Sequence, residues 1–295
     1  MLQSLFSLLA AGAMLILPAQ AREVQDALGR KVQAPDAPRR ILALSEPDLD
    51  ALLALGAPPL AASRGRGQNG FPAYLQQAPG IKQVAQLGNF MQTGSEAIMQ
   101  YKPDLILAGS HNDPAQLAQW SKIAPVIVSF TPGETWESGF LRIAAALDKS
   151  EQAQQLLHAQ QQEIARLKQQ LKPASISIVR WNISGPAFMQ RDAFASRLIH
   201  SLGWRRPPAQ ALPGSAHSAP LSQEAFAVLD ADWIAIGGLG PQAQQDLHSA
   251  RKHPAMAQLH AVRQGRMRVV DGAVWTGPGG YLAAQALLRD IAQWQ

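Results

Sequence analysis

The sequence predicts an α/β protein of two similar lobes, with mainly parallel sheets, one long connecting helix and a ligand cleft between the lobes. Two observations carry this prediction. Residues 96–109 (EAIMQYKPDLILAG) and residues 224–237 (EAFAVLDADWIAIG) align without a gap, and each copy reads as a short helix, a tight turn and a buried strand. Between the copies, residues 147–171 carry apolar side chains near helical spacing. A repeated helix-to-strand step is typical of a parallel α/β sheet.

Size and composition support a compact two-lobe chain. The protein has 295 residues, of which 47% are hydrophobic and 16% charged, which excludes a long disordered polyelectrolyte. The formal net charge of +5 is modest for this length, so we expect no nucleic-acid partner. Because the chain has no cysteine, disulfides, thiolate metal sites, a cysteine nucleophile and a lipid-anchored cysteine are all excluded.

The N-terminus reads as a secretory signal peptide over residues 1–21. An apolar run from Leu5 to Leu17 is too short to span a membrane, and Ala19-Gln20-Ala21 has the small-x-small pattern that precedes cleavage. The alternative is a buried N-terminal helix. We therefore expect a mature protein that is exported across the inner membrane.

The predicted N-terminal lobe covers residues 22–146 and consists of short alternating units. Its expected strands and helix lie at 41–44, 48–55 (a helix closed by Gly56), 59–62 and 126–129. The connecting helix is expected over residues 147–172. Asp148 and Glu151 resemble a capping box at its start, Pro173 stops it, and at 1.5 Å per residue it is long enough to join two lobes. The alternative is an ordinary surface helix of one large domain.

The predicted C-terminal lobe covers residues 173–295. Its expected elements are a strand at 175–180, a helix at 194–202 ended by Gly203, a strand at 267–270 and a terminal helix at 278–294.

Ligands in open α/β sheets lie beyond the carboxyl ends of the strands. The residues that follow the predicted strands are basic and aromatic, with polar companions that include Ser45, Glu46, Ser110 and Thr131. Arginine offers forked donors to anionic oxygens, and tryptophan supplies flat apolar area. An anionic, partly aromatic or metal-chelated ligand fits such a lining. The candidate ligand-binding residues are Arg64, Arg66, His111, Arg180, Trp181, His217 and Trp275.

Each candidate also has a purely structural interpretation. Arg64 and Arg66 suit a solvated loop, Trp181 and Trp275 suit a core, and His111 and His217 suit hydrogen-bonded loops. The two histidines could instead bracket a bare metal ion, but no carboxylate sits at an obvious companion position, so we expect no protein-bound metal.

Common catalytic motifs give no support for an enzyme. Residues 65–70 match GxGxxG, yet Phe71-Pro72 follows instead of a long helix, and the chain has no GxSxG, HExxH or Walker sequence. The members of a Ser/His/Asp catalytic triad can be far apart in the sequence and need no local motif. An exported α/β hydrolase is therefore the alternative function of another class.

Four segments together resemble the helical-hinge periplasmic binding proteins of ABC importers: the opening DALGRKVQAPDAPRRILALSEPDLDALLALGAPPLAAS, the phrase EAIMQYKPDLILAG, the connecting helix, and the terminal VWTGPGGYLAAQALLRDI. The similarity extends over the mature chain in the family's order, and its opening is similar to the iron-siderophore branch. The resemblance implies a monomeric carrier of a ferric siderophore with no enzymatic activity and no cofactor. Haem and cobalamin carriers are the nearest alternatives.

The resemblance also implies a partner, the permease dimer of an inner-membrane ABC importer. In this family one glutamate on each lobe docks onto permease arginines, and the matching positions are Glu96 and Glu224. The internal repeat places these acids at equivalent sites, as a two-fold partner requires. The local alternative is helix capping: Thr93 and Glu96 resemble a capping box, and Glu224 lies in a first helical turn.

Overall fold

A computed structural model describes residues 21–89, 92–182, 184–240 and 253–294, together with Gln242, Gln245 and Leu247. Apart from Ala21, the predicted signal peptide lies outside the described residues. Within the described part of the chain, no helix combines the length and the apolar character that crossing a bilayer requires.

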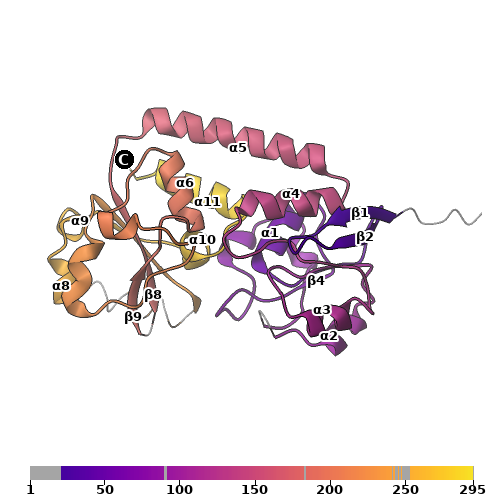
Figure 1. Cartoon of the computed structure of the whole chain (residues 1–295). Helices are drawn as coiled ribbons and strands as arrows, with labels where there is room; N and C mark the ends of the chain where they lie inside the picture. The colour runs from indigo at the N-terminus through magenta and orange to yellow at the C-terminus, as the bar shows by residue number, and fades with distance from the viewer. Residues whose placement is uncertain are drawn as a thin grey trace, which may run out of the picture.

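The N-terminal lobe is built on a five-stranded parallel sheet in the order β5-β4-β3-β6-β7. Alternate residues of β3 enter two core clusters on opposite faces of this sheet, as the period of a strand requires. The helices of this lobe lie on both sides of the sheet (Figure 1). The elements are β3 (Ile41–Ala43), α1 (Glu46–Ala54), β4 (Ala61–Ala62), η1 (Ala73–Leu75), η2 (Ile81–Gln83), β5 (Ala85–Gln86), α2 (Ser95–Gln100), β6 (Leu105–Leu107), α3 (Pro114–Trp120), β7 (Val126–Ile127) and α4 (Trp136–Ala146).

An antiparallel hairpin that the sequence analysis did not predict precedes this sheet. Strands β1 (Ala21–Gln25) and β2 (Lys31–Pro35) pair along their whole length. Buried Asp26 closes the turn by accepting hydrogen bonds from the backbone N–H and the guanidinium of Arg30, at 2.9 Å and 2.6–2.8 Å. The same carboxylate accepts a bond from the Val128 backbone N–H at 3.3 Å, which ties the hairpin to the sheet.

The C-terminal lobe has a four-stranded sheet in the order β11-β10-β8-β9, parallel except for the β8–β9 pair. The predicted two-lobe α/β fold with mainly parallel sheets is confirmed. The elements are β8 (Ile176–Asn182), β9 (Gly185–Phe188), α6 (Phe194–Ser201), η3 (Pro208–Gln210), η4 (Gln223–Leu229), β10 (Trp233–Gly238), α8 (Pro254–Ala257), α9 (His260–Arg263), β11 (Met267–Val269), α10 (Gly272–Thr276) and α11 (Tyr281–Ala292).

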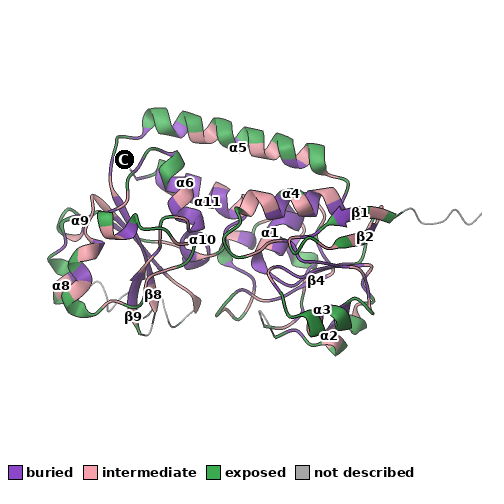
Figure 2. Ribbon diagram, in the orientation of Figure 1, coloured by how far each residue is buried: buried purple, intermediate pink, exposed green. Residues whose placement is uncertain are grey.

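Helix α5 (Ser150–Gln170) runs along the outside of both lobes (Figure 1). Ala153 near its start is buried in the core of the N-terminal lobe, and Leu167 near its end is buried in the core of the C-terminal lobe. Most of its remaining surface is exposed (Figure 2). The predicted capping box is wrong: Lys149 is the N-cap, and Asp148 has a positive φ of 57° and pairs with Arg22 at 2.9 Å.

The predicted terminal helix at 278–294 corresponds to α11, which begins at Tyr281 and ends at Ala292, and the short helix α10 before it was not predicted. Helix α10 ends at Thr276, the segment Gly277-Pro278-Gly279-Gly280 turns the chain, and α11 follows. Pro278 lacks a backbone N–H, which is one physical reason for the break. Helix α11 belongs to the second half of the sequence but packs on α1 and η1 of the N-terminal lobe.

The internal repeat corresponds to equivalent structure in the two lobes. Asp104 precedes β6 and accepts hydrogen bonds from the backbone N–H groups of Arg39 and Arg40, beside the start of β3. Asp232 precedes β10 and accepts the backbone N–H and hydroxyl of Ser175, beside the start of β8. Each aspartate thus fixes the entry into the neighbouring parallel strand. The preceding helices differ: α2 is an α-helix, whereas η4 is a 3-10 helix.

Candidate functional site

A cleft of about 550 Å³ lies between the two lobes, a size suited to a small-molecule ligand. The N-terminal lobe contributes the loop from Phe130 to Glu137, and α5 contributes Gln160 and Ile164. The C-terminal lobe contributes one face of α6 and two loop segments, Ser215–His217 and Thr276–Pro278. The cleft therefore draws its walls from both halves of the sequence.

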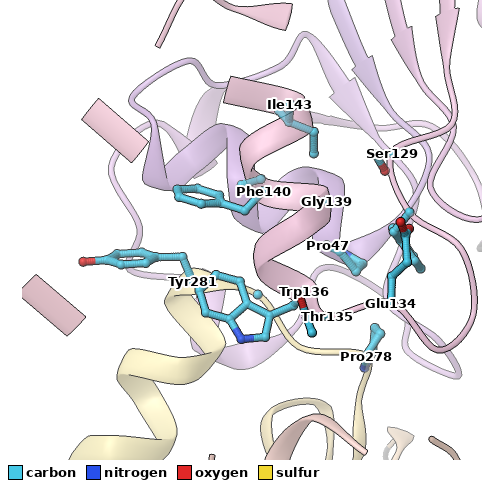
Figure 3. A pocket seen from close by; sticks show the side chains of 13 residues that line it. Pro47, Ser129, Glu134, Thr135, Trp136, Gly139, Phe140, Ile143, Pro278 and Tyr281 are labelled. Carbon is cyan, nitrogen blue, oxygen red and sulfur yellow. The ribbon is translucent and has the colours of Figure 1, made fainter. Parts of the chain in front are cut away.

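A second hollow adjoins this cleft and is too small for such a ligand. It has a volume of about 40 Å³ and lies between α4 and the start of α11. Figure 3 shows the rings of Trp136, Phe140 and Tyr281 gathered beside it. The ring of Tyr281 stacks on that of Phe140, with the centroids 5.7 Å apart and an angle of 12° between the planes. This hollow belongs to the packing between the lobes.

Two arginines, one from each lobe, line the main cleft. Arg66 comes from the loop after β4 and Arg180 from β8. Burial and, to a smaller extent, the positive charge of Arg66 lower the pKa of Arg180 to about 10. Arg180 is held in place because its guanidinium donates hydrogen bonds to the backbone oxygen and to the hydroxyl of Thr276. Two guanidinium groups that repel each other across a cleft form an attractive site for an anion.

A buried carboxylate, that of Glu46, lies next to this pair of arginines. Glu46, the first residue of α1, accepts a hydrogen bond from the backbone N–H of Arg66 at 2.6 Å. Burial raises the pKa of Glu46, while Arg66 and Arg180 favour its charged form. Glu46 thus fixes the loop that carries Arg66 to the N-terminal end of α1.

Two of the acidic residues in the lining are paired with arginines outside it. Glu134 pairs with Arg142 at 3.1 Å, and Asp192 pairs with Arg191 at 3.0 Å. The hydrogen bond from Arg191 lowers the pKa of Asp192. A further cation, Arg197 of α6, lines the cleft and donates a hydrogen bond to the backbone oxygen of Gly133 on the other lobe, at 3.4 Å.

Three of the seven predicted ligand-binding residues line the cleft: Arg66, Arg180 and His217. Three of the polar companions named at the predicted strand ends also line it: Glu46, Ser110 and Thr131. The structure thus brings together residues from both halves of the chain, because the carboxyl ends of both parallel sheets face the same space.

Four predicted residues lie elsewhere. Arg64 is half-buried outside the lining, and its backbone N–H donates to Gly88. Trp181 packs on an apolar cluster of the C-terminal lobe. His111 is buried, with Nδ1 at the Ala108 oxygen and its ring edge-on to Trp120, so it does not face His217 across the cleft.

The expected cleft position of Trp275 is wrong. Trp275 is fully buried in the core, stacks on Trp294 with the ring planes 2° apart, and donates its Nε1–H to Asp290 at 2.8 Å. The strand before it ends at Val269, and the short helix α10 turns the indole inward. Trp275 is therefore a core residue, which was its structural interpretation in the sequence.

Two further residues that line the cleft, Trp136 and Arg197, were not predicted from the sequence. Trp136 begins α4 after the N-cap Thr135, and Arg197 is a half-buried residue of α6. Both lie on helices, so a search restricted to strand ends could not find them. The signal for Trp136 was the turn TPGET that follows the strand containing Val126.

The two predicted docking acids are both exposed. Glu96 lies in the first turn of α2 and Glu224 in the first turn of η4. The expected capping box at Thr93 is wrong, because the N-cap of α2 is Gly94 and the buried Thr93 hydroxyl hydrogen-bonds to Ser63 at 3.2 Å. A hydrogen bond from Ser222 lowers the pKa of Glu224.

The chemistry available in the cleft is that of binding an anion between arginines and an aromatic ring. His217 is the histidine of the lining, and its Nδ1 lies 2.8 Å from the backbone oxygen of Ser218. Among the described residues, no group of three or more histidine, cysteine, aspartate or glutamate side chains is placed to hold a metal ion.

Comparison with known proteins agrees with this architecture. The siderophore-binding lipoprotein YfiY of Bacillus subtilis, described as probable, is 27% identical over 282 residues, covering 92% of this chain and 86% of that protein. The achromobactin-binding periplasmic protein of Dickeya dadantii is 27% identical over 265 residues, covering 87% and 86%. The crystal structure of Staphylococcus aureus SirA complexed with staphyloferrin B has a TM-score of 0.76 at 20% identity, covering 92% of this chain and 97% of that one.

The model of one protein family spans most of the molecule. It matches residues 41–274, from the first strand of the N-terminal sheet to the helix that follows the last strand of the C-terminal sheet. The chain belongs to the periplasmic binding protein family.

Proposed function

We propose that this protein is a periplasmic solute-binding protein that captures a ferric siderophore in the interlobe cleft and delivers it to an inner-membrane ABC importer. The observation that carries the proposal is the pair Arg66 and Arg180, contributed by different lobes to one cleft and close enough for the charge of one to lower the pKa of the other. An anionic chelate relieves this repulsion and holds the lobes together through forked hydrogen bonds.

The two relatives support the class of ligand. One is described as siderophore-binding and the other as achromobactin-binding, and both align over most of this chain. In the proposed complex the chelator holds the iron, and the protein contributes charge, hydrogen bonds and the ring of Trp136. The protein carries its ligand without performing a reaction, and its signal peptide is removed on export.

Tryptophan fluorescence of the mature protein tests the proposal. A panel of anionic ferric carboxylate and ferric catecholate chelates, a cationic ferric hydroxamate, haem and cobalamin is titrated in turn. Trp136 lines the cleft and is the reporter, and Trp136→Phe is the control that should lose the signal. Saturable quenching by an anionic ferric chelate is expected. Quenching by haem or cobalamin alone would assign the cleft to another ligand, and no response across the panel would overturn the carrier function.

Arg180→Ala tests the charge pair directly. Removing the guanidinium takes away one of the three arginines that line the cleft, so we expect affinity for the anionic chelate to fall at least tenfold. Arg263→Ala, on the exposed surface of the same lobe, is the matched control and should bind like the parent. Calorimetric titration gives both affinities, and equal affinity of the two variants would exclude Arg180 from the site.

A further inference from the structure

The N-terminus of α11 is capped by a residue of the other lobe. Asp50 of α1 is fully buried, and its carboxylate accepts hydrogen bonds from the backbone N–H groups of Leu282 at 2.9 Å and Ala283 at 3.0 Å. These partners lie 232 and 233 residues further along the chain. A carboxylate here satisfies two free N–H groups and interacts favourably with the helix dipole. The N-cap residue itself, Gly280, has no side chain to do so.

Two glycines allow this close approach. A Cβ on Gly280 would collide with the Asp50 carboxylate, whose three atoms are its nearest neighbours. Gly279 has a φ of +89°, and a Cβ there would collide with the Phe194 ring at the start of α6. The backbone before α11 therefore passes between a carboxylate of the N-terminal lobe and a ring of the C-terminal lobe, where only glycine fits.

The first residue of α11 reaches in the same direction. The ring of Tyr281 stacks on Phe140, and its centroid lies 6.5 Å from that of Trp136 (Figure 3). Tyr281 and Leu282 pack on the core of the N-terminal lobe, although α11 belongs to the second half of the sequence. This end of α11 is thus held by α1 on one side and by α4 on another.

The same helix α1 is linked to Arg66 directly and to Arg180 through the start of α11. Glu46, one turn before Asp50, holds the loop of Arg66. The segment just before α11 contains Thr276, which accepts the hydrogen bonds of Arg180. Because Asp50 fixes the start of α11, it also fixes the end of the segment that carries Thr276. Two buried acids at i and i+4 of α1 therefore act on the two sides of the cleft.

We propose that Asp50 is a positioning residue that pins the C-terminal lobe to the N-terminal lobe through α11 and so sets the separation of Arg66 and Arg180. The pin acts beside the cleft, whereas α5 joins the lobes along the outside of the molecule (Figure 1). The positioning role of Asp50 is inferred from these contacts alone, whereas its effect on ligand affinity rests on the proposed function.

A purely local role, capping α11, must be separated from this interlobe role. The variant Asp50→Ala removes both the cap of α11 and the link between the lobes. In the double variant Asp50→Ala/Gly280→Ser, the serine caps α11 from its own N-cap position, where the backbone is extended and the departed carboxylate leaves room. The double variant thus restores the cap without restoring the link between lobes. It also keeps the test valid if Asp50→Ala folds poorly.

Interlobe distance, measured without ligand, is the decisive readout. The chain has no cysteine, so Gln119→Cys on α3 and Gln258→Cys after α8, both exposed, carry two unique spin labels. Pulsed electron–electron double resonance then gives the distribution of distances between the two spin labels, one on each lobe. We expect a narrow distribution in the parent and a broadened or shifted one in the double variant, together with a thermal midpoint close to that of the parent.

The control is Gly94→Ala, at the N-cap of α2, where nothing lies within 4 Å of the added Cβ and the distribution should stay that of the parent. A parent-like distribution in the double variant would overturn the proposal and reduce Asp50 to a helix cap. Titration with the chelate that the parent binds should show affinity at least fivefold lower in the double variant. If the parent binds no chelate, the proposed function fails, while the distance result still decides the role of Asp50.

Discussion

Three carboxylates of α1, at Glu46, Asp48 and Asp50, are buried, and each has a different task. Glu46 holds the loop of Arg66, and Asp50 caps α11. Asp48 accepts hydrogen bonds from the hydroxyls of Ser45, at 2.8 Å, and Ser129. These serines follow β3 and β7, so Asp48 joins the carboxyl ends of two strands beside the cleft. Buried carboxylates placed this closely need hydrogen-bond donors around them, and apart from Ser45 the donors named here come from segments distant in the sequence.

The raised pKa values of two of these acids lead us to expect an unusual dependence of folding stability on pH. Burial raises the pKa of Asp48 and of Asp50 from 3.8 to about 6. Between about pH 4 and pH 6 the folded chain therefore binds protons that the unfolded chain has lost, so stability falls as the pH rises through this window. We expect the free energy of unfolding in urea to be roughly 1–3 kcal/mol higher at pH 5 than at pH 7.

Asp48→Asn is the variant for this measurement, because asparagine has no proton to gain. It should lose a large part of the increase between pH 7 and pH 5. Below about pH 4 the trend reverses in the parent, since acids with lowered pKa, such as Asp192 and Asp232, lose their hydrogen-bonded charge. A parent whose stability rises steadily from pH 5 to pH 7 would contradict the assignment.

At the scale of elements, the connecting helix α5 holds two separate cores. Ala153 is buried in the first lobe and Leu167, 1% exposed, in the second, while the surface between them is mostly polar. Leu156 and Leu157 also pack on the first core and Ile164 on the second, so the apolar contacts of this 21-residue helix divide between the two lobes. The helix is stiff between its ends and anchored at both.

Leu167→Ala tests the anchor in the second lobe. The lost apolar contacts and the cavity should lower the free energy of unfolding by about 2–4 kcal/mol. Leu141→Ala on α4, where the leucine is 37% exposed, is the matched control and should cost far less. Urea unfolding followed by circular dichroism compares the two variants, and equal effects would mean that the end of α5 is not anchored in the core.

At the scale of the whole molecule, the internal repeat places one exposed glutamate on each lobe at related positions. Glu96 and Glu224 are separated from the cleft lining and stand at the starts of equivalent short helices. We propose that they bind the two halves of a permease dimer, because two equivalent acids match a partner with two-fold symmetry.

Charge reversal separates docking from ligand capture. Glu96→Lys/Glu224→Lys should reduce uptake through the reconstituted importer at least tenfold while leaving chelate affinity within a factor of two. Glu151→Lys on the exposed face of α5 is the control for a change of surface charge and should transport like the parent. Loss of chelate binding in the double variant would instead show that these acids support the fold.

Several features of this protein follow from the sequence alone. Apolar runs and an ungapped repeat predicted two parallel α/β lobes, and helical periodicity predicted α5, because strand and helix periods are local properties of the chain. The ends of predicted strands indicated Arg66 and Arg180, which both line the cleft. Arg66 follows β4 and Arg180 lies in the second half of β8, and the carboxyl ends of parallel strands converge in any fold of this type.

Tertiary structure decided the rest. Trp275 lies in the core and Trp136 in the cleft because the inward or outward direction of a ring depends on how α10 and α4 pack, which no local pattern records. Asp148 and Thr93 fit capping patterns, yet they bind Arg22 and Ser63, which are distant in sequence. The contact between Asp50 and α11 was likewise invisible in the sequence: its two sides are more than 230 residues apart, and only packing the lobes together creates it.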